Sequence, residues 1–209
     1  MPVALVTLEG ICLSYHTKAE ETSAIENLNM KVHAGEFVSI VGPSGCGKTT
    51  ALSLIMGLIP PTAGTVATGG VKMGYMLQRD QLFPWRTVEK NVMLGLEVQH
   101  RLTRESRERT MELLHTYGLW EFRRYLPAQL SGGMRQKVAL IRTLATEPEL
   151  LLLDEPFSAL DYQTRLCIAD EVCEIIKRES KTAILVTHDI SEPEFIKDRK
   201  KQPYLMGLL

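Results

Sequence analysis

The sequence predicts an α/β fold with a mostly parallel core sheet, because short apolar runs alternate with helical patterns along the chain. The runs expected to form buried strands are residues 36–42, 71–77, 150–154 and 182–187. All but the second are almost continuously apolar, which is typical of parallel strands that are covered on both faces. The earlier segment 6–15 is expected to add N-terminal antiparallel strand.

Helical patterns fill the intervals between these runs. The expected helices lie at about 48–57, 87–96, 103–117, 131–145 and 161–179. The interval between the second and third strands is too long for a single crossover connection. We therefore expect an inserted helical subdomain at about 88–135, within a single domain that spans 1–209.

Composition and charge limit the classes of function. A chain of 209 residues can bury a core without disulfides or metals. Lys+Arg 24 against Asp+Glu 25 leaves no basic excess, so nucleic acid is not an expected partner. The four cysteines show no C-x-x-C spacing, which disfavours a zinc or redox motif. Neither a signal peptide nor an apolar run of bilayer length is visible, so we expect membrane attachment only through a partner.

The stretch GPSGCGKT fits the phosphate-binding pattern G-x-x-x-x-G-K-[ST]. Gly42, Gly45 and Gly47 allow the backbone to wrap with N–H groups turned inward, and the following helix adds the positive end of its dipole. Lys48 is expected to reach the β- and γ-phosphates, and the Thr49 hydroxyl to bind magnesium. The alternative is an ordinary glycine-rich turn, which the position between an expected strand and an expected helix disfavours. The loop residues expected to bind nucleotide are Gly42, Pro43, Ser44, Gly45, Cys46, Gly47, Lys48, Thr49 and Thr50.

The stretch LLLLDEP supplies two carboxylates at the end of an expected central strand. Ligands of open α/β sheets bind at that edge, so Asp154 is expected to hold magnesium. A second carboxylate beside the first is costly unless a cation or a water requires it. We therefore expect Glu155 to polarise an attacking water. The alternative is an acidic pair that caps a helix before Pro156.

The stretch LSGGMRQ (130–136) lies between these two motifs. With GPSGCGKT before it and LLLLDEP after it, it resembles the nucleotide-binding subunit of ATP-binding cassette (ABC) transporters, over about residues 5–190. ATPases with a phosphate loop generally lack LSGG, so the three motifs in this order are highly specific. The resemblance implies a P-loop NTPase fold, ATP and Mg²⁺ as cofactors, and ATP hydrolysis coupled to transport.

The resemblance also implies that two copies of the chain pair head to tail. ATP would then lie between the phosphate loop of one copy and Ser131, Gly132 and Gly133 of the other. Exposed N–H groups at the start of a helix form such an anion site. A simple N-cap by Ser131 is the alternative reading, and the two roles are compatible.

Other positions match the family pattern individually. Tyr15 would stack on adenine, unless it is a core tyrosine. Gln78 would contact magnesium and water, unless it is a plain surface residue. Asp161, in SALD (158–161), would cross the dimer interface, and His188 would contact the γ-phosphate, although a lone histidine is usually structural. The resemblance thus assigns hydrolysis to Lys48, Gln78, Glu155 and His188, and magnesium to Thr49, Gln78 and Asp154.

The segment 74–99 resembles the subunits that serve nitrate, sulfonate and taurine importers. This branch implies a separate membrane permease, a substrate-binding protein that acts indirectly, and a peripheral position on the cytoplasmic side of the membrane. Residues 82–85 would form the groove that receives a short helix of the permease. The alternative is that Phe83 and Trp85 pack into the helical subdomain.

Residues 192–209 depart from the family pattern. Relatives usually continue after THDISE through a helix and at least one further strand, whereas this chain continues with PEFIKDRKKQPYLMGLL. We therefore expect an atypical, truncated tail that leaves one edge of the core sheet less covered and lowers stability.

Two other functions remain open at this point. One is a hydrolysis-deficient or truncated cassette that binds ATP and dimerises without driving transport. The other is a family member that acts in DNA repair or translation, but the second cassette or long coiled coil of those relatives is not visible in this sequence.

Overall fold

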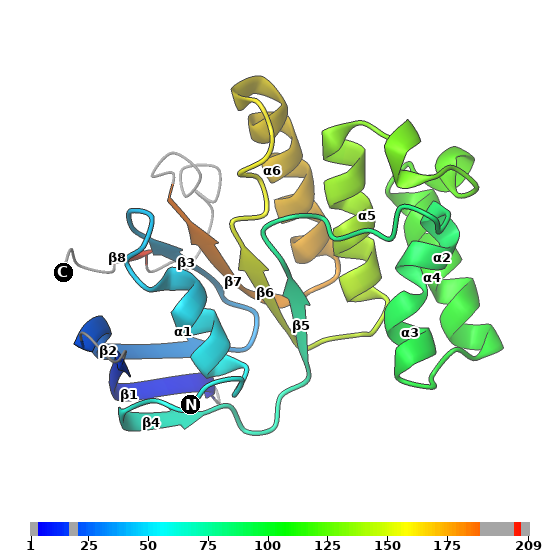
Figure 1. Cartoon of the computed structure of the whole chain (residues 1–209). Helices are drawn as coiled ribbons and strands as arrows, with labels where there is room; N and C mark the ends of the chain where they lie inside the picture. Colours follow the sequence, from blue (N-terminus) through cyan, green and yellow to red (C-terminus); the bar gives the residue numbers. More distant parts are fainter. Residues whose placement is uncertain (1–3, 17–20, 189–202, 206–209) are drawn as a thin grey trace. The chain divides into compact units, whose positions relative to one another are not determined.

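A computed structural model describes residues 4–16, 21–188 and 203–205 of the chain (Figure 1). The chain divides into two compact units. The first combines Met1–Met73, Glu149–Asp154 and Ser180–Leu209, and the second combines Gly74–Pro148 and Glu155–Glu179. Within the described residues, no helix is long and apolar enough to cross a bilayer.

The N-terminal strands form an antiparallel sheet in the first unit. β1 (Ala4–His16) lies between β2 (Glu21–His33) and β4 (Ala63–Ala67). Buried positions along β1 change from even to odd numbers, from Val6 and Leu8 to Ile11 and Leu13. The change coincides with register shifts on either side of Ile11 and with Gly10 at φ 59°, as expected for a β-bulge that re-aims the following side chains.

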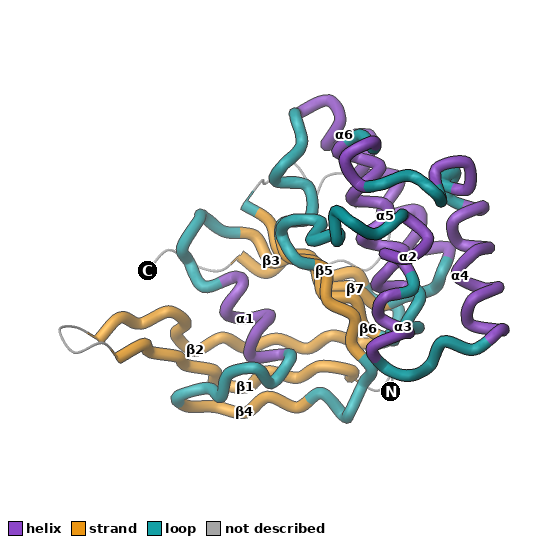
Figure 2. The backbone as a smooth tube through the Cα atoms, turned by 45° about the vertical axis from the view of Figure 1, so that its right-hand side comes forward, coloured by secondary structure: helices purple, strands orange, loops and turns teal. Residues whose placement is uncertain are grey.

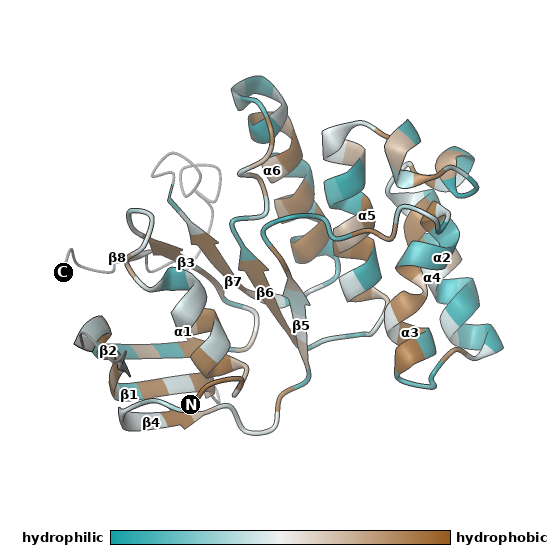
Figure 3. Ribbon diagram, viewed as in Figure 1, coloured by the Kyte–Doolittle hydropathy of each residue, from teal (hydrophilic) through white to brown (hydrophobic). Residues whose placement is uncertain are grey.

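The parallel sheet of the first unit contains β6 (Leu150–Asp154), β7 (Thr182–Thr187), β3 (Phe37–Val41) and β8 (Pro203–Leu205), side by side in that order. Every residue of β6 and β7 is buried, and Figure 3 shows β3, β6 and β7 as strongly apolar arrows. α1 (Lys48–Ile55) follows β3. Parallel strands next to an N-terminal antiparallel sheet confirm the predicted fold class.

The short strand β8 changes the expectation for the tail. Pro203, Tyr204 and Leu205 pair in parallel with Ser39–Val41 of β3. The sequence predicts a tail that leaves one edge of the core sheet less covered, but residues 203–205 cover that edge beside β3. Proline lacks a backbone N–H and is tolerated as the first residue of a strand or at a sheet edge. The rest of 192–209 lies outside the described residues.

The second unit is mainly helical (Figure 2). The strand β5 (Met73–Met76) begins one residue before the first segment of this unit. The helices are α2 (Val88–Val92), α3 (Leu94–Val98), α4 (Arg104–Thr116), α5 (Gly132–Leu144) and α6 (Tyr162–Arg178). Two 3-10 turns lie at Trp120–Phe122 and Pro127–Gln129. The single helix expected at 87–96 is instead two short helices that meet at Met93. The expected subdomain boundaries of 88–135 stay a prediction.

Asn91, on α2, organises the turn at Phe83–Thr87. Its side chain is fully buried and accepts a hydrogen bond from the Phe83 N–H at 2.8 Å. Its amide donates to the carbonyl oxygens of Phe83 at 3.1 Å, Arg86 at 2.9 Å and Thr87 at 3.1 Å. The fully buried amide of Asn91 thereby satisfies its own polar atoms and ties the backbone of the turn to α2.

We predict that Asn91→Ala destabilises the protein by about 2–4 kcal/mol, because the turn loses the four hydrogen bonds that this buried amide makes. Urea unfolding of the variant and the parent measures this difference. Gln163→Ala removes an exposed amide from α6 and should change stability by less than about 0.5 kcal/mol. An Asn91→Ala midpoint equal to that of the control would contradict the prediction.

Candidate functional site

The loop at 42–49 joins β3 to α1 in the first unit. Gly45 and Gly47 have φ values of 86° and 89°, in the left-handed region that suits glycine. A Cβ on Gly47 would meet the Ala24 carbonyl oxygen at 2.3 Å, whereas one on Gly45 would meet open space. The sequence explains Gly45 and Gly47 by loop curvature, and the structure adds a close approach to β2 at Gly47.

Lys48 lies within the curve of this loop. It is 5% exposed, and its Nζ donates to the carbonyl oxygens of Gly42 at 2.9 Å and Pro43 at 2.8 Å. The Gly42 N–H donates to Thr187 of β7 at 3.3 Å, which ties the start of the loop to the parallel sheet. The ammonium group is therefore held inside the loop by the loop's own carbonyl groups.

Thr49 and Asp154 bring two oxygen atoms together from segments 105 residues apart. The Thr49 hydroxyl donates to Asp154 Oδ1 at 3.0 Å, and Asp154 is 4% exposed at the end of β6. A hydroxyl and a carboxylate are ligands that Mg²⁺ uses alongside phosphate and water. No cluster of three or more His, Cys, Asp or Glu side chains forms a metal cage in the described parts of the chain. The Thr49 hydroxyl and the Asp154 carboxylate, as oxygen donors, fit a magnesium ion that takes its further ligands from phosphate and water.

Glu155 and Gln78 are in contact within the second unit. Gln78 Nε2 donates to Glu155 Oε2 at 3.3 Å. Glu155 has φ 42°, an unfavourable backbone conformation for a residue with a side chain. Neither Asp154 nor Glu155 caps a helix, because the next helix, α6, begins at Tyr162 with Asp161 as its N-cap. The carboxylate of Glu155 is thus held by Gln78 and is not used as a helix cap, which is compatible with a chemical role.

The LSGG turn begins α5. Ser131 is the N-cap and accepts a hydrogen bond from the Met134 N–H at 3.2 Å. A Cβ on Gly133 would meet Ile168 of α6 at 2.6 Å, and one on Gly132 would meet Leu160 at 2.9 Å. Both glycines therefore have a packing reason within one chain. This reason was not foreseen from the sequence, and it is compatible with phosphate binding.

The remaining site candidates are accessible. Tyr15 is 47% exposed on β1, so it is not a core tyrosine. His188 is exposed directly after β7. Asp161 caps α6 by accepting from the Thr164 N–H at 3.1 Å, and hydrogen bonds from Thr164 lower the pKa of Asp161. The carboxylate is thereby kept ionised at an exposed helix start.

The segment 82–85 is partly exposed. Leu82 is buried, but Trp85 is 73% exposed and stacks on Phe83 with ring centroids 5.1 Å apart. The alternative in which Trp85 packs into the helical region is therefore excluded. The two stacked rings form a surface that we call the ring stack.

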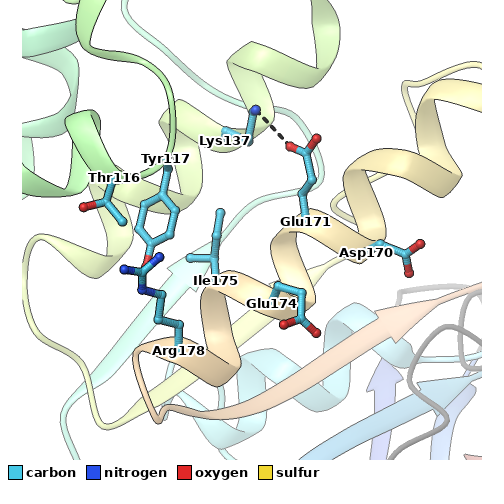
Figure 4. A pocket seen from close by; sticks show the side chains of 8 residues that line it. All are labelled: Thr116, Tyr117, Lys137, Asp170, Glu171, Glu174, Ile175 and Arg178. Carbon is cyan, nitrogen blue, oxygen red and sulfur yellow. Dashed lines mark ion pairs between the residues drawn. The ribbon is translucent and has the colours of Figure 1, made fainter.

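A separate cavity of about 570 Å³ lies in the second unit (Figure 4). Its lining residues are Thr116, Tyr117, Lys137, Asp170, Glu171, Glu174, Ile175 and Arg178. Lys137 pairs with Glu171 at 2.9 Å, and the Tyr117 hydroxyl donates to Glu179 at 2.6 Å. Burial, followed by this hydrogen bond, raises the pKa of Tyr117. None of the predicted site residues lines this cavity.

Comparison with known sequences identifies similar proteins. A family model described as ABC transporter matches residues 25–158. YtlC of Bacillus subtilis, an uncharacterized ABC transporter ATP-binding protein, is 47% identical over 91% of this chain and 76% of its own length. The aliphatic sulfonates import ATP-binding protein SsuB 1 of Rhodococcus jostii is 45% identical, over 86% and 72%. The nitrate import ATP-binding protein NrtD of Synechocystis is 41% identical, over 84% and 69%.

A solved structure of the ATP-binding cassette MJ0796 matches with a TM-score of 0.75 and 35% identity. The match covers 91% of this chain and 90% of that one. The MJ0796 structure is a dimer in a post-hydrolysis state, bound to ADP and phosphate.

The close packing of Gly133 against Ile168 generates a double-mutant test. Gly133→Ala should cost about 1–3 kcal/mol, because the added methyl overlaps the isoleucine side chain. Ile168→Ala should cost about 2–4 kcal/mol through the lost packing. The double variant should be more stable than the sum of the single effects predicts, by about 0.5–3 kcal/mol, because the smaller side chain leaves room for the methyl. Urea unfolding of the four proteins measures this coupling. Additive effects would contradict the prediction, because they would show that the contact with Ile168 does not set the cost of Gly133→Ala.

Proposed function

This chain belongs to the ABC transporter family, and on that premise we propose that it powers the import of a small anionic solute through a separate membrane permease. As a member of the family it is an ATP-binding subunit and an ATPase. The importer assignment is supported by its similarity to a sulfonate and a nitrate import subunit, whose solutes both carry negative charge. The proposed location is the cytoplasmic face of the membrane, as a peripheral subunit.

The observation that carries the ATP-binding part of the proposal is the hydrogen bond between Thr49 and Asp154, next in sequence to the buried Lys48. In the proposed complex, Lys48 binds the β- and γ-phosphates, and Thr49 and Asp154 hold magnesium, with Gln78 as a further ligand. A bound magnesium ion would neutralise charge on the phosphates during transfer. Hydrolysis then needs mainly positioning and charge stabilisation from the protein.

Glu155 is the proposed base. It would accept a proton from water while the water oxygen bonds to the γ-phosphorus and the bond to the ADP oxygen breaks. Its hydrogen bond to Gln78 holds the carboxylate in place. The hydrolysis-deficient cassette considered above is not favoured, because each residue needed for this reaction is present.

We further propose that two copies pair head to tail around ATP. The first N–H groups of α5 have no partner within the helix itself, so Ser131, Gly132 and Gly133 offer an anion site to the other copy's γ-phosphate. His188 would contact the same phosphate, Tyr15 would stack on adenine, and Asp161 would face the partner. The dimeric state of MJ0796, bound to ADP and phosphate, supports pairing of two copies. Loss of the γ-phosphate would release the pair, and the permease would use that motion.

The first test concerns Glu155. Glu155→Gln should lower ATP hydrolysis by about 10²–10⁴-fold, because the amide cannot accept the proton of the attacking water. Phosphate release measures hydrolysis, and light scattering should show an ATP-dependent dimer that persists in the variant. Glu108→Gln, which removes a carboxylate that is 65% exposed on α4, is the matched control. Full activity in Glu155→Gln would overturn the assignment of the base.

The second test concerns the ring stack. Trp85→Ala should reduce co-purification with the permease and abolish permease-stimulated hydrolysis, because the variant removes the most exposed aromatic side chain of the proposed docking surface. Basal hydrolysis of the isolated chain should remain unchanged. Val98→Ala removes a side chain that is 70% exposed elsewhere in the unit and serves as the control. Permease binding that survives Trp85→Ala would place docking elsewhere.

A further inference from the structure

We propose that Arg135 and Arg142 are positioning residues that couple the ring stack to the Ser131 turn through α5. The inference rests on the proposed function, since the ring stack is the proposed permease contact and the turn the proposed phosphate contact. All of the residues involved belong to the second unit. The two arginines lie on the helix that begins at the turn.

Arg142 forms hydrogen bonds to the backbone that precedes the ring stack. Its NH1 donates to the Gln81 carbonyl at 2.7 Å and its NH2 donates to the Asp80 carbonyl at 2.8 Å. The planar guanidinium can bridge two successive carbonyls, which a lysine ammonium cannot do with the same fixed geometry. Burial lowers the pKa of Arg142, and the charge of Asp80 opposes this shift. A partly buried cation with two short bonds therefore fixes the position of residues 80 and 81.

Arg135 joins the same segment directly to the phosphate turn. Its Nε donates to Asp80 Oδ2 at 3.0 Å, and its NH1 donates to the Leu130 carbonyl at 2.9 Å. Leu130 immediately precedes Ser131. A displacement of Asp80 is thus carried by one side chain to the residue that positions the N-cap.

The far end of the segment is fixed as well. Asn91 bonds to the backbone of Phe83, Arg86 and Thr87, and Asp80 accepts from the Leu82 N–H at 3.1 Å. Gln81, between these anchors, has φ 47°, which indicates that its surroundings over-determine its conformation. The backbone that carries the ring stack is therefore held by hydrogen bonds on both sides.

These contacts give a specific physical consequence. A permease that moves the ring stack would shift Asp80, and the arginines would pass that shift to α5 and Ser131. Coupling between two sites is reciprocal. ATP that binds at Ser131 should therefore also slow hydrogen exchange in the segment 79–86. If the two arginines only stabilised the fold, hydrogen exchange in the segment would be the same with and without ATP.

The test uses hydrogen exchange of the peptide 79–86 in the full chain with Glu155→Gln, with and without Mg-ATP, while light scattering records pairing. In this parent, pairing should slow exchange in the peptide. Adding Arg142→Gln should remove the ATP-dependent slowing although pairing persists. Arg142→Lys should remove most of it, because the charge remains but the fork does not. Arg104→Gln, with a side chain that is 92% exposed, should behave as the parent.

If Arg142→Gln fails to fold, Arg135→Gln tests the same link at a side chain that is 37% exposed. ATP-dependent slowing that survives in the arginine variants overturns the inference and leaves the proposed function standing. Faster exchange in both nucleotide states, with the ATP effect intact, also overturns the inference, because the arginines would then only stabilise the fold. Absence of ATP-driven pairing in the parent overturns the head-to-tail dimer itself, and the inference falls with it.

Discussion

The hydrogen bond between Thr49 and Asp154 is the contact on which the proposed magnesium site of the first unit depends. It exists because β6 and β3 run parallel on either side of β7, so their carboxyl ends meet at one edge of the sheet. The phosphate loop starts at the end of β3, and the acidic pair starts at the end of β6. A register shift of one residue in β6 would turn Asp154 to the opposite face and remove the second oxygen from the site.

Much of this arrangement could be predicted from the sequence. Continuous apolar runs identify β3, β6 and β7, since only strands covered on both faces need no polar alternation. The fixed spacing of GPSGCGKT identifies the loop, because its glycines and Lys48 act within a few residues of one another. Ser131 as an N-cap is likewise a local property of the chain.

The contacts that escaped prediction join residues far apart in sequence. Arg142 reaches Asp80 across 62 positions, and nothing in its own helix identifies that partner. The packing of Gly133 against Ile168 depends on how closely α5 and α6 approach, and periodicity does not give that distance. β8 was missed because three residues that begin with proline carry almost no strand signal.

The close approach of Gly47 to Ala24 has a consequence for transplanting the phosphate loop. The sequence motif spans eight residues, yet the Ala24 carbonyl oxygen of β2 lies 2.3 Å from where a Cβ on Gly47 would be. A graft of residues 42–49 onto a scaffold without that strand would keep the glycines and the lysine but lose the surface that limits how far the loop can relax. A graft should therefore include the loop together with the strand β2.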